Sequence, residues 1–280
     1  MRNLWGARSG GEPVCLLIVL SRVRADLPLV VAANRDELFE RPALAMTVLQ
    51  EGPPRVLGGR DLKGGGTWLA VNEHGLVAAL TNRPAAGGPV PARRSRGELA
   101  LALARHGSAV LAAGAFATSF HARDFNPAWL LVGDREALFY IDMTVSEGPV
   151  VRPLAPGVHI LENRPLDAGS AKVEHVRGLL SGAEDLSREA LLGLLRSVLA
   201  DHRLEAVTTE ADGDEERPVE VSAACVHSER YGTRWSGLVS VGADRRQRPE
   251  VLYADGPPCL TRFVQGTSLW SEAQPPESSA

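Results

Sequence analysis

The sequence has few cysteines and no apolar run long enough to cross a membrane. Its three cysteines, Cys15, Cys225 and Cys259, are too few and too far apart for a disulfide framework or a cysteine-rich metal site. The longest apolar stretch, Val14 to Leu20, is far shorter than the roughly 20 residues of a membrane-spanning helix. We therefore expect a cytoplasmic protein with reduced thiols, no membrane span, no metal and no cofactor.

A surplus of positive charge is also missing. The formal net charge is -4 and the isoelectric point about 6.0, which gives no electrostatic footprint for nucleic acid. None of the seven histidines pairs with another at metal-ligand spacing. The glycine clusters at 58–59 and 64–66 lack the spacing of a phosphate-binding loop. Nucleic-acid and nucleotide binding are thus disfavoured.

What the chain does have is enough apolar sequence for a large core, with 44% hydrophobic residues in 280. Short β-branched segments bounded by turn residues predict strands at 14–23, 29–33, 67–71, 76–80, 129–132, 137–142, 157–163, 221–227, 238–241 and 250–253. Helical spacing predicts helices at 95–117, 170–180 and 187–200, with Ser95 as an N-cap of the first. Strands and helices come in runs without βαβ alternation, which favours an α+β, layered αββα fold with antiparallel sheets.

The ends of the chain differ in composition from its middle. Residues 1–13 are rich in Gly and Arg and unpatterned, and we interpret them as a disordered leader or a wrongly assigned start. Residues 14–265 are expected to form a single domain, and 266–280 a disordered tail. The acidic stretch at 208–218 reads as a loop. No small-residue cleavage site follows the first apolar run, so secretion is not expected.

Three predicted strands end in an asparagine followed by arginine. These pairs are Asn34-Arg35, Asn82-Arg83 and Asn163-Arg164. Strand ends that meet at one edge of a sheet could gather these side chains around one site, and an uncharged amide is a good donor to an oxyanion. The ordinary alternative is that each asparagine simply ends a strand, because asparagine tolerates turn geometry and the proline after two of the pairs stops the ladder.

Cys15 lies at the start of the first predicted strand. By itself it fits a small buried hydrophobic residue, and no histidine partner for a catalytic thiol is apparent. If Cys15 were the first residue of the mature chain, its own α-amino group, with a pKa of roughly 7.7–8.0, could serve as the base. Fourteen residues precede it, but an alternative bacterial GTG start codon at Val14 would be read as methionine. Removal of that methionine would leave Cys15 first.

Several motifs resemble one known family. They are "CLLIV", "ANRDE", "GGRDLKGGGTWLAVNEHG", "ALTNRP", "LENRPLD" and "RYGTRWSG", in this order. Together they resemble the NRDE family, of the transport and Golgi organisation protein 2 type, over about residues 15–263. That family is similar to the N-terminal-nucleophile hydrolase superfamily and, in layout, to choloylglycine hydrolases and penicillin V acylases. The resemblance implies a four-layer αββα sandwich.

The resemblance also implies roles for individual residues. Cys15 would be the nucleophile, and an asparagine at the end of a strand would donate to the oxyanion. The implied site consists of Cys15, Arg35 and Asp36 bonded to its thiol and α-amino group, Asn82 as the oxyanion donor, Asn163 orienting the nucleophile, and Arg234 balancing charge.

Two functions follow from the resemblance. The first is a cysteine hydrolase acting on a linear amide (C–N) bond of a small or acyl-bearing substrate. The alternative is a non-catalytic protein on the same fold that binds or carries lipid, acyl-CoA or haem. A scaffold without chemistry is a third interpretation, which the density of motifs disfavours. The sequence leaves the substrate and the oligomeric state open.

Overall fold

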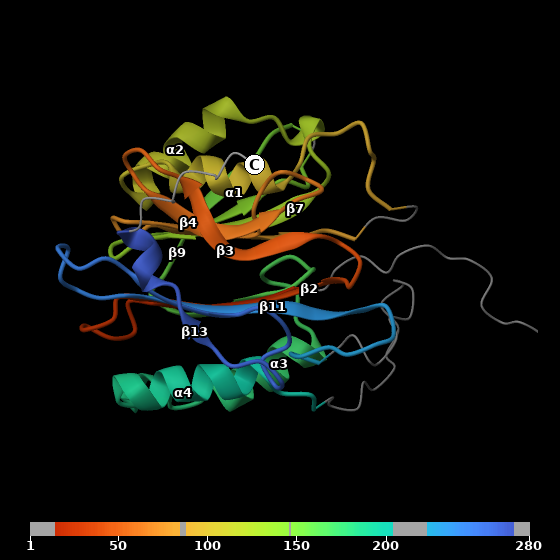
Figure 1. The fold of residues 1–280 in the computed structure, drawn as a ribbon. Helices are drawn as coiled ribbons and strands as arrows, with labels where there is room; N and C mark the ends of the chain where they lie inside the picture. The colour runs from red at the N-terminus through yellow and green to blue at the C-terminus, as the bar shows by residue number, and fades with distance from the viewer. Residues whose placement is uncertain (1–14, 85–87, 146, 204–222, 272–280) are drawn as a thin grey trace, which may run out of the picture.

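The computed structural model describes residues 15–84, 88–145, 147–203 and 223–271. The predicted leader and the acidic loop lie outside these residues. Two antiparallel sheets pack face to face, and helices cover the outer face of each, which makes four layers (Figure 1). The predicted αββα architecture with antiparallel sheets is confirmed.

The first sheet carries the segment that begins at Cys15. It has six strands in the order β10-β1-β2-β11-β12-β13, and every neighbouring pair is antiparallel. Its strands are β1 (Leu16–Ser21), β2 (Leu29–Leu38), β10 (Gly157–Leu161), β11 (Tyr231–Val241), β12 (Glu250–Ala254) and β13 (Val264–Gln265).

The second sheet has seven strands in sequence order from β3 to β9, again all antiparallel. Its strands are β3 (Ala43–Gln50), β4 (Val56–Asp61), β5 (Leu69–Asn72), β6 (Val77–Asn82), β7 (Ala128–Gly133), β8 (Leu138–Asp142) and β9 (Val150–Leu154). Short connections join the successive strands of this sheet except β6 and β7, which are separated in the chain by residues 83–127.

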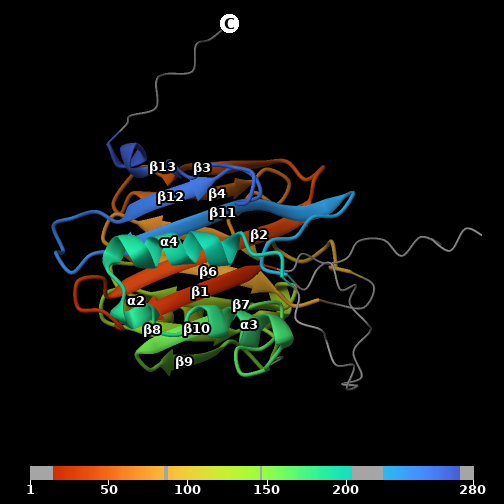
Figure 2. The same cartoon turned by 90° about the horizontal axis from the view of Figure 1, so that it is seen from below.

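Four α-helices form the two outer layers. They are α1 (Gly97–Ala104), α2 (Ala109–Ser119), α3 (Ala171–Leu179) and α4 (Arg188–Leu199). The first two cover the second sheet (Figure 1), and α3 and α4 cover the first sheet (Figure 2). Ser170 and Ser187 cap α3 and α4 through their side chains, as serine before a helical run predicts. Ser95 does not cap α1, because that helix begins at Gly97 with Arg96 in the N-cap position.

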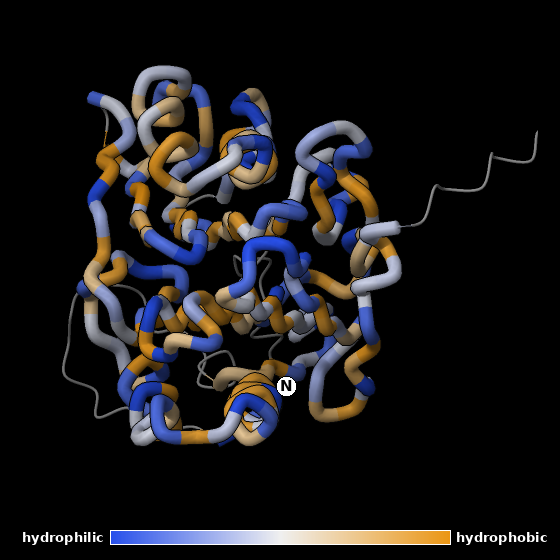
Figure 3. The backbone as a smooth tube through the Cα atoms, turned by 90° about the vertical axis from the view of Figure 1, so that its left-hand side faces the viewer, coloured by the Kyte–Doolittle hydropathy of each residue, from blue (hydrophilic) through white to orange (hydrophobic). Residues whose placement is uncertain are grey.

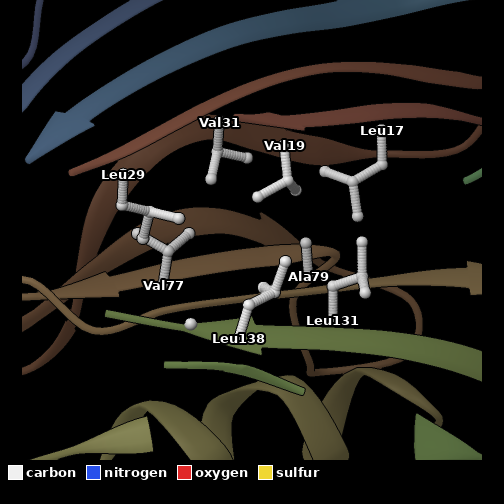
Figure 4. A pocket seen from close by; sticks show the side chains of 9 residues that line it. Leu17, Val19, Leu29, Val31, Val77, Ala79, Leu131 and Leu138 are labelled. Atoms are coloured by element: carbon white, nitrogen blue, oxygen red, sulfur yellow. The ribbon is translucent and has the colours of Figure 1, made fainter. Parts of the chain in front are cut away.

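Apolar side chains of alternate strand residues fill the space between the sheets. Leu17, Val19 and Val31 of the first sheet face Val77 and Leu131 of the second (Figure 4). They leave a cavity of only about 10 Å³, roughly the space of one water molecule. Hydrophobic strand segments are accordingly stacked in the middle of the molecule (Figure 3). This core is too tightly packed to hold a ligand.

Several details differ from the sequence prediction. The strands β3, β4 and β9 were not predicted, and the helix predicted at 95–117 is two helices, α1 and α2. The second strand, β2, continues to Leu38, so Asn34 lies inside a strand instead of ending it. The predicted strand at 221–227 is absent from its described part, 223–227, where only His227 forms an isolated bridge. The predicted tail begins too early, because Thr267–Trp270 form a short 3-10 helix and the buried Trp270 donates from its indole nitrogen to the Pro249 carbonyl.

Candidate active site

Cys15 lies directly before β1, between β2 on one side and β10 on the other. Leu16 pairs with Asn34 of β2, so one further step along that register places Cys15 beside Arg35. Leu17 pairs with Leu161 of β10, so two further steps place Cys15 near Asn163. The antiparallel hairpin therefore brings the cysteine to the Asn-Arg-Asp-Glu segment.

Asn163 holds the backbone nitrogen of Cys15. This nitrogen donates to Asn163 Oδ1 at 2.6 Å, and Asn163 Nδ2 donates to the carbonyl of Asn82. The neighbouring Thr81 hydroxyl donates to the Glu162 carbonyl at 2.9 Å. These bonds link β6 of the second sheet to the end of β10 in the first. Two asparagines from different sheets thus meet beside the cysteine.

The thiol of Cys15 is buried, with 7% of the residue exposed. Burial, and after it the Asp36 carboxylate, raise its pKa to about 12, although the Asp36 N–H and the Arg35 charge oppose this rise. In this form of the chain the sulfur is a protonated, weak nucleophile. Any reactivity therefore requires a base that takes the thiol proton.

Asp36 lies on the helix-covered face of β2. Its Oδ1 accepts a 2.5 Å hydrogen bond from the Thr233 hydroxyl of β11. Burial raises the pKa of Asp36 to about 6, and the Lys172 charge is the largest influence that lowers it. Lys172 comes from α3 and is itself buried. Among the described residues, Lys172 Nζ and Asp36 Oδ2 have no hydrogen-bond partner.

Arg35 points the opposite way, toward the second sheet. Its guanidinium lies 4.5 Å from the ring centroid of Trp68, 3.3 Å from Glu37 and 3.5 Å from Asp61. Arg41 completes this ion cluster through a 2.7 Å bond to Asp61. A side chain at Gly59 would collide with the Trp68 ring, which explains one glycine of the "GGRD" motif as space for an indole instead of a phosphate loop.

The other two asparagines of the Asn-Arg pairs, Asn82 and Asn34, lie in different surroundings. Asn82 ends β6, and its side-chain amide has no hydrogen-bond partner in the part of the chain that the structure describes. Asn34 instead donates to the carbonyls of Leu199 and Ala224 and accepts from Ser236, so it braces the sheet against α4. The three asparagines therefore do not form one group, because strand alternation turns Asn34 away from the cysteine.

Arg234 is not brought to Cys15. It is the extra residue of a β-bulge in β11, and its guanidinium donates to the backbone carbonyls of Leu38 and Arg41. These bonds fix the turn after β2. The contacts of Arg234 therefore do not support its predicted role in balancing charge at the nucleophile. The arginine beside Cys15 is Arg35.

Four residues of this region received no role from the sequence. Asp61, Trp68 and Thr233 belong to quoted motifs, so their presence there was the available signal. Lys172 belongs to no motif. The one signal for Lys172 in the sequence is its rarity, because Lys172 and Lys63 are the only lysines among 30 basic residues.

Comparisons with known proteins show the family of this chain. The family model described as Transport and Golgi organisation 2 matches residues 14–249. A Transport and Golgi organization protein 2 homolog from Bos taurus is 33% identical over 237 residues, covering 77% of this chain and 83% of that protein. The human homolog is 27% identical over the same shares of the two chains. These relatives are mammalian and give no support to a bacterial origin.

Solved structures show the fold. A variant of conjugated bile acid hydrolase from Clostridium perfringens superposes with a TM-score of 0.51 at 12% identity, covering 90% of this chain and 92% of that one. Separately, no helix in the described residues is long and apolar enough to cross a membrane. From the family match and the structural likeness, the chain belongs to the Transport and Golgi organisation 2 family and has the fold of the N-terminal-nucleophile hydrolases.

Proposed function

We propose that the chain, once it begins at Cys15, hydrolyses a linear amide (C–N) bond of a small or acyl-bearing substrate. The observation that carries this proposal is the 2.6 Å bond from the Cys15 nitrogen to Asn163 Oδ1. In a chain that starts at Cys15, this nitrogen is an α-amino group instead of an amide. It would lie on the same residue as the thiol and act as its base.

The first half of the reaction forms an acyl-enzyme. The α-amino group accepts the proton of the Cys15 thiol, and the sulfur attacks the substrate carbonyl carbon. The ionised Asp36, near the thiol, stabilises the ammonium group that forms. The negative charge on the tetrahedral oxygen is met by the Asn82 side-chain amide. The ammonium then returns its proton to the leaving nitrogen, the C–N bond breaks, and a thioester to Cys15 remains.

The second half releases the acid. Water adds to the thioester carbonyl while the α-amino group takes one of its protons, and the C–S bond breaks with the proton returned to sulfur. Asn163 serves both halves by holding the amino nitrogen and the Asn82 backbone in one place. Positioning of this kind is a large part of the catalytic effect in enzymes.

The alternative is a protein that binds or carries an acyl-bearing lipid or haem. Two observations favour it for the chain that keeps residues before Cys15. The thiol is then buried with its pKa raised to about 12. A surface pocket of about 430 Å³ lies between β3 and β12, away from the proposed catalytic residues, and is lined by Leu44, Tyr253 and Arg262 among others. That volume suits a small ligand.

The experiment that tests hydrolysis is trapping of the acyl-enzyme. The chain beginning at Cys15 is incubated with N-acyl amines of increasing acyl length, and released amine and intact mass are measured. We expect amine release and an added acyl mass on the peptide that contains Cys15, both absent in Cys15→Ala. If the acyl compounds bind equally to both versions without amine release, the carrier interpretation replaces hydrolysis.

Lys172 is expected to set the pH dependence through Asp36. Because burial raises the pKa of Asp36 to about 6, the folded state holds this proton more tightly than the unfolded chain does. Its contribution to stability is therefore complete at low pH and is lost as the pH rises through about 6. Lys172→Met removes the largest influence that lowers this pKa. Both this loss of stability and the acid limb of amide hydrolysis should move to higher pH.

The matched control is Lys63→Met, because Lys63 is exposed. Urea unfolding and kcat/KM are measured for both variants across pH 4 to 9. A purely structural role for Lys172 predicts lower stability with an unmoved acid limb, and that result would contradict the proposal that Lys172 acts on hydrolysis through the pKa of Asp36.

A further inference from the structure

Four side chains that the proposed hydrolysis does not use converge at one place. They are His202, just after α4, Cys225 and His227, in the segment that leads into β11, and Cys259, in the loop after β12. One ligand atom from each lies within 4.8 Å of the others. The sequence alone disfavoured such a site because no ligand pair has metal-site spacing along the chain.

Three distances within the cluster are close to those of a tetrahedral ion site. Cys225 Sγ lies 3.7 Å from Cys259 Sγ and 3.7 Å from His227 Nε2, and His227 Nε2 lies 3.1 Å from Cys259 Sγ. Zinc with bonds of about 2.3 Å to sulfur and 2.0–2.1 Å to nitrogen places its ligand atoms roughly 3.5–3.8 Å apart. Two of the three measured distances fall in this range, and the third is shorter by a few tenths of an ångström.

His202 has the outer hydrogen bond that is typical of a ligand histidine. Its Nδ1 lies 3.0 Å from the Cys225 carbonyl oxygen. A carbonyl can only accept, so Nδ1 carries the proton and Nε2 keeps its lone pair for an ion. Metal-bound histidines commonly donate their other ring nitrogen to a carbonyl in this way, which fixes the ring. The rings of His202 and His227 lie 5.0 Å apart between centroids.

We propose that His202, Cys225, His227 and Cys259 bind one zinc-class divalent ion. Two thiolates and two imidazoles are the ligand set of structural zinc sites, and four protein ligands leave no open position for catalysis. A disulfide between the cysteines is the competing chemistry. Its sulfurs would be about 2.05 Å apart, whereas both cysteines are free here. The proposal does not depend on amide hydrolysis.

The ion would fix the segment that supports the active site. The Ala224 carbonyl accepts from Asn34, and the Val226 N–H donates to the Thr233 hydroxyl at 2.9 Å. The same hydroxyl donates to Asp36. Cys225, a proposed ligand, lies between Ala224 and Val226. An ion held there therefore ties three separate parts of the chain together beside Asp36.

The experiment measures metal in the full chain, purified without a histidine tag in reducing buffer free of chelator. We expect about one equivalent of zinc per chain by inductively coupled plasma mass spectrometry. Replacement by Co²⁺ should give the visible absorption of tetrahedral cobalt together with a thiolate charge-transfer band. Chelator should lower the melting temperature, and added zinc should restore it.

Cys259→Ser is the informative variant, because Cys259 is exposed and its replacement leaves the core intact. It should weaken zinc binding at least 100-fold and remove part of the charge-transfer band. Cys15→Ser, outside the cluster, should leave both unchanged, and Cys225→Ser provides a second loss at the buried ligand. Less than a tenth of an equivalent with no cobalt spectrum overturns the proposal. So does a spectrum that Cys259→Ser leaves unchanged, or a Cys225–Cys259 disulfide in protein alkylated on isolation.

Discussion

Alkylation of Cys15 by iodoacetamide near neutral pH is expected to be about 100-fold slower than that of an exposed cysteine when residues 1–14 are present. Burial raises the pKa of this thiol from 9.0 to about 12, which lowers the thiolate fraction near neutral pH about 1000-fold. The greater nucleophilicity of a more basic thiolate recovers about 20-fold of this, and poor solvent access to the buried sulfur lowers the rate further. When the chain begins at Cys15, its amino group is free to act as base, and we expect the rate to rise at least 100-fold.

The rate of amide hydrolysis should also be higher in the chain that begins at Cys15, by a larger factor than the rate of alkylation. General-base catalysis is worth roughly 10²–10⁴-fold, and the longer chain has an amide where the base should be. The two versions are prepared from one cleavable fusion, with and without residues 1–14, and the alkylated peptide is identified by mass spectrometry so that Cys225 and Cys259 serve as internal references. Equal Cys15 reactivity in both versions would contradict the proposed mechanism.

Asn163→Ala is expected to lower kcat/KM by about 10²–10³-fold in the chain that begins at Cys15. Asn163 accepts from the nucleophile's own nitrogen and donates to the Asn82 backbone, so its loss frees both the base and the residue proposed to meet the oxyanion. Loss of one oxyanion donor alone commonly costs about 2.7–4 kcal/mol of barrier. Steady-state kinetics on the amide identified by acyl-enzyme trapping give the measurement.

Asn34→Ala is the matched control, because Asn34 is also a buried asparagine but faces α4, away from Cys15. It leaves two carbonyls and one hydroxyl without a partner, and the free energy of unfolding should fall by roughly 3 kcal/mol. Its kcat/KM should change much less than that of Asn163→Ala under conditions where both are folded. If Asn34→Ala lowers kcat/KM more than Asn163→Ala does, the assignment of Asn163 to the site is wrong.

Local patterns predicted the elements well where one face of an element is buried. The strands β1 and β2, the strands that end near Asn82 and Asn163, and the helices α3 and α4 all follow from alternation or helical spacing. Boundaries were poorer where polar residues continue a strand. The predicted strand stops at residue 33 because Asn34 to Glu37 are charged or polar, yet pairing with β11 keeps them extended.

The sequence by itself determined the layered antiparallel fold, the family and the segments that meet at Cys15, because apolar periodicity and ordered motifs are properties of the chain. Only the tertiary structure decided which side chains face one another. Strand alternation turned Asn34 to α4, a bulge directed Arg234 to the turn after β2, and α3 brought Lys172 to Asp36. It also gathered His202, Cys225, His227 and Cys259 from three segments. Contacts between residues far apart in sequence depend on register and packing, which no local pattern specifies.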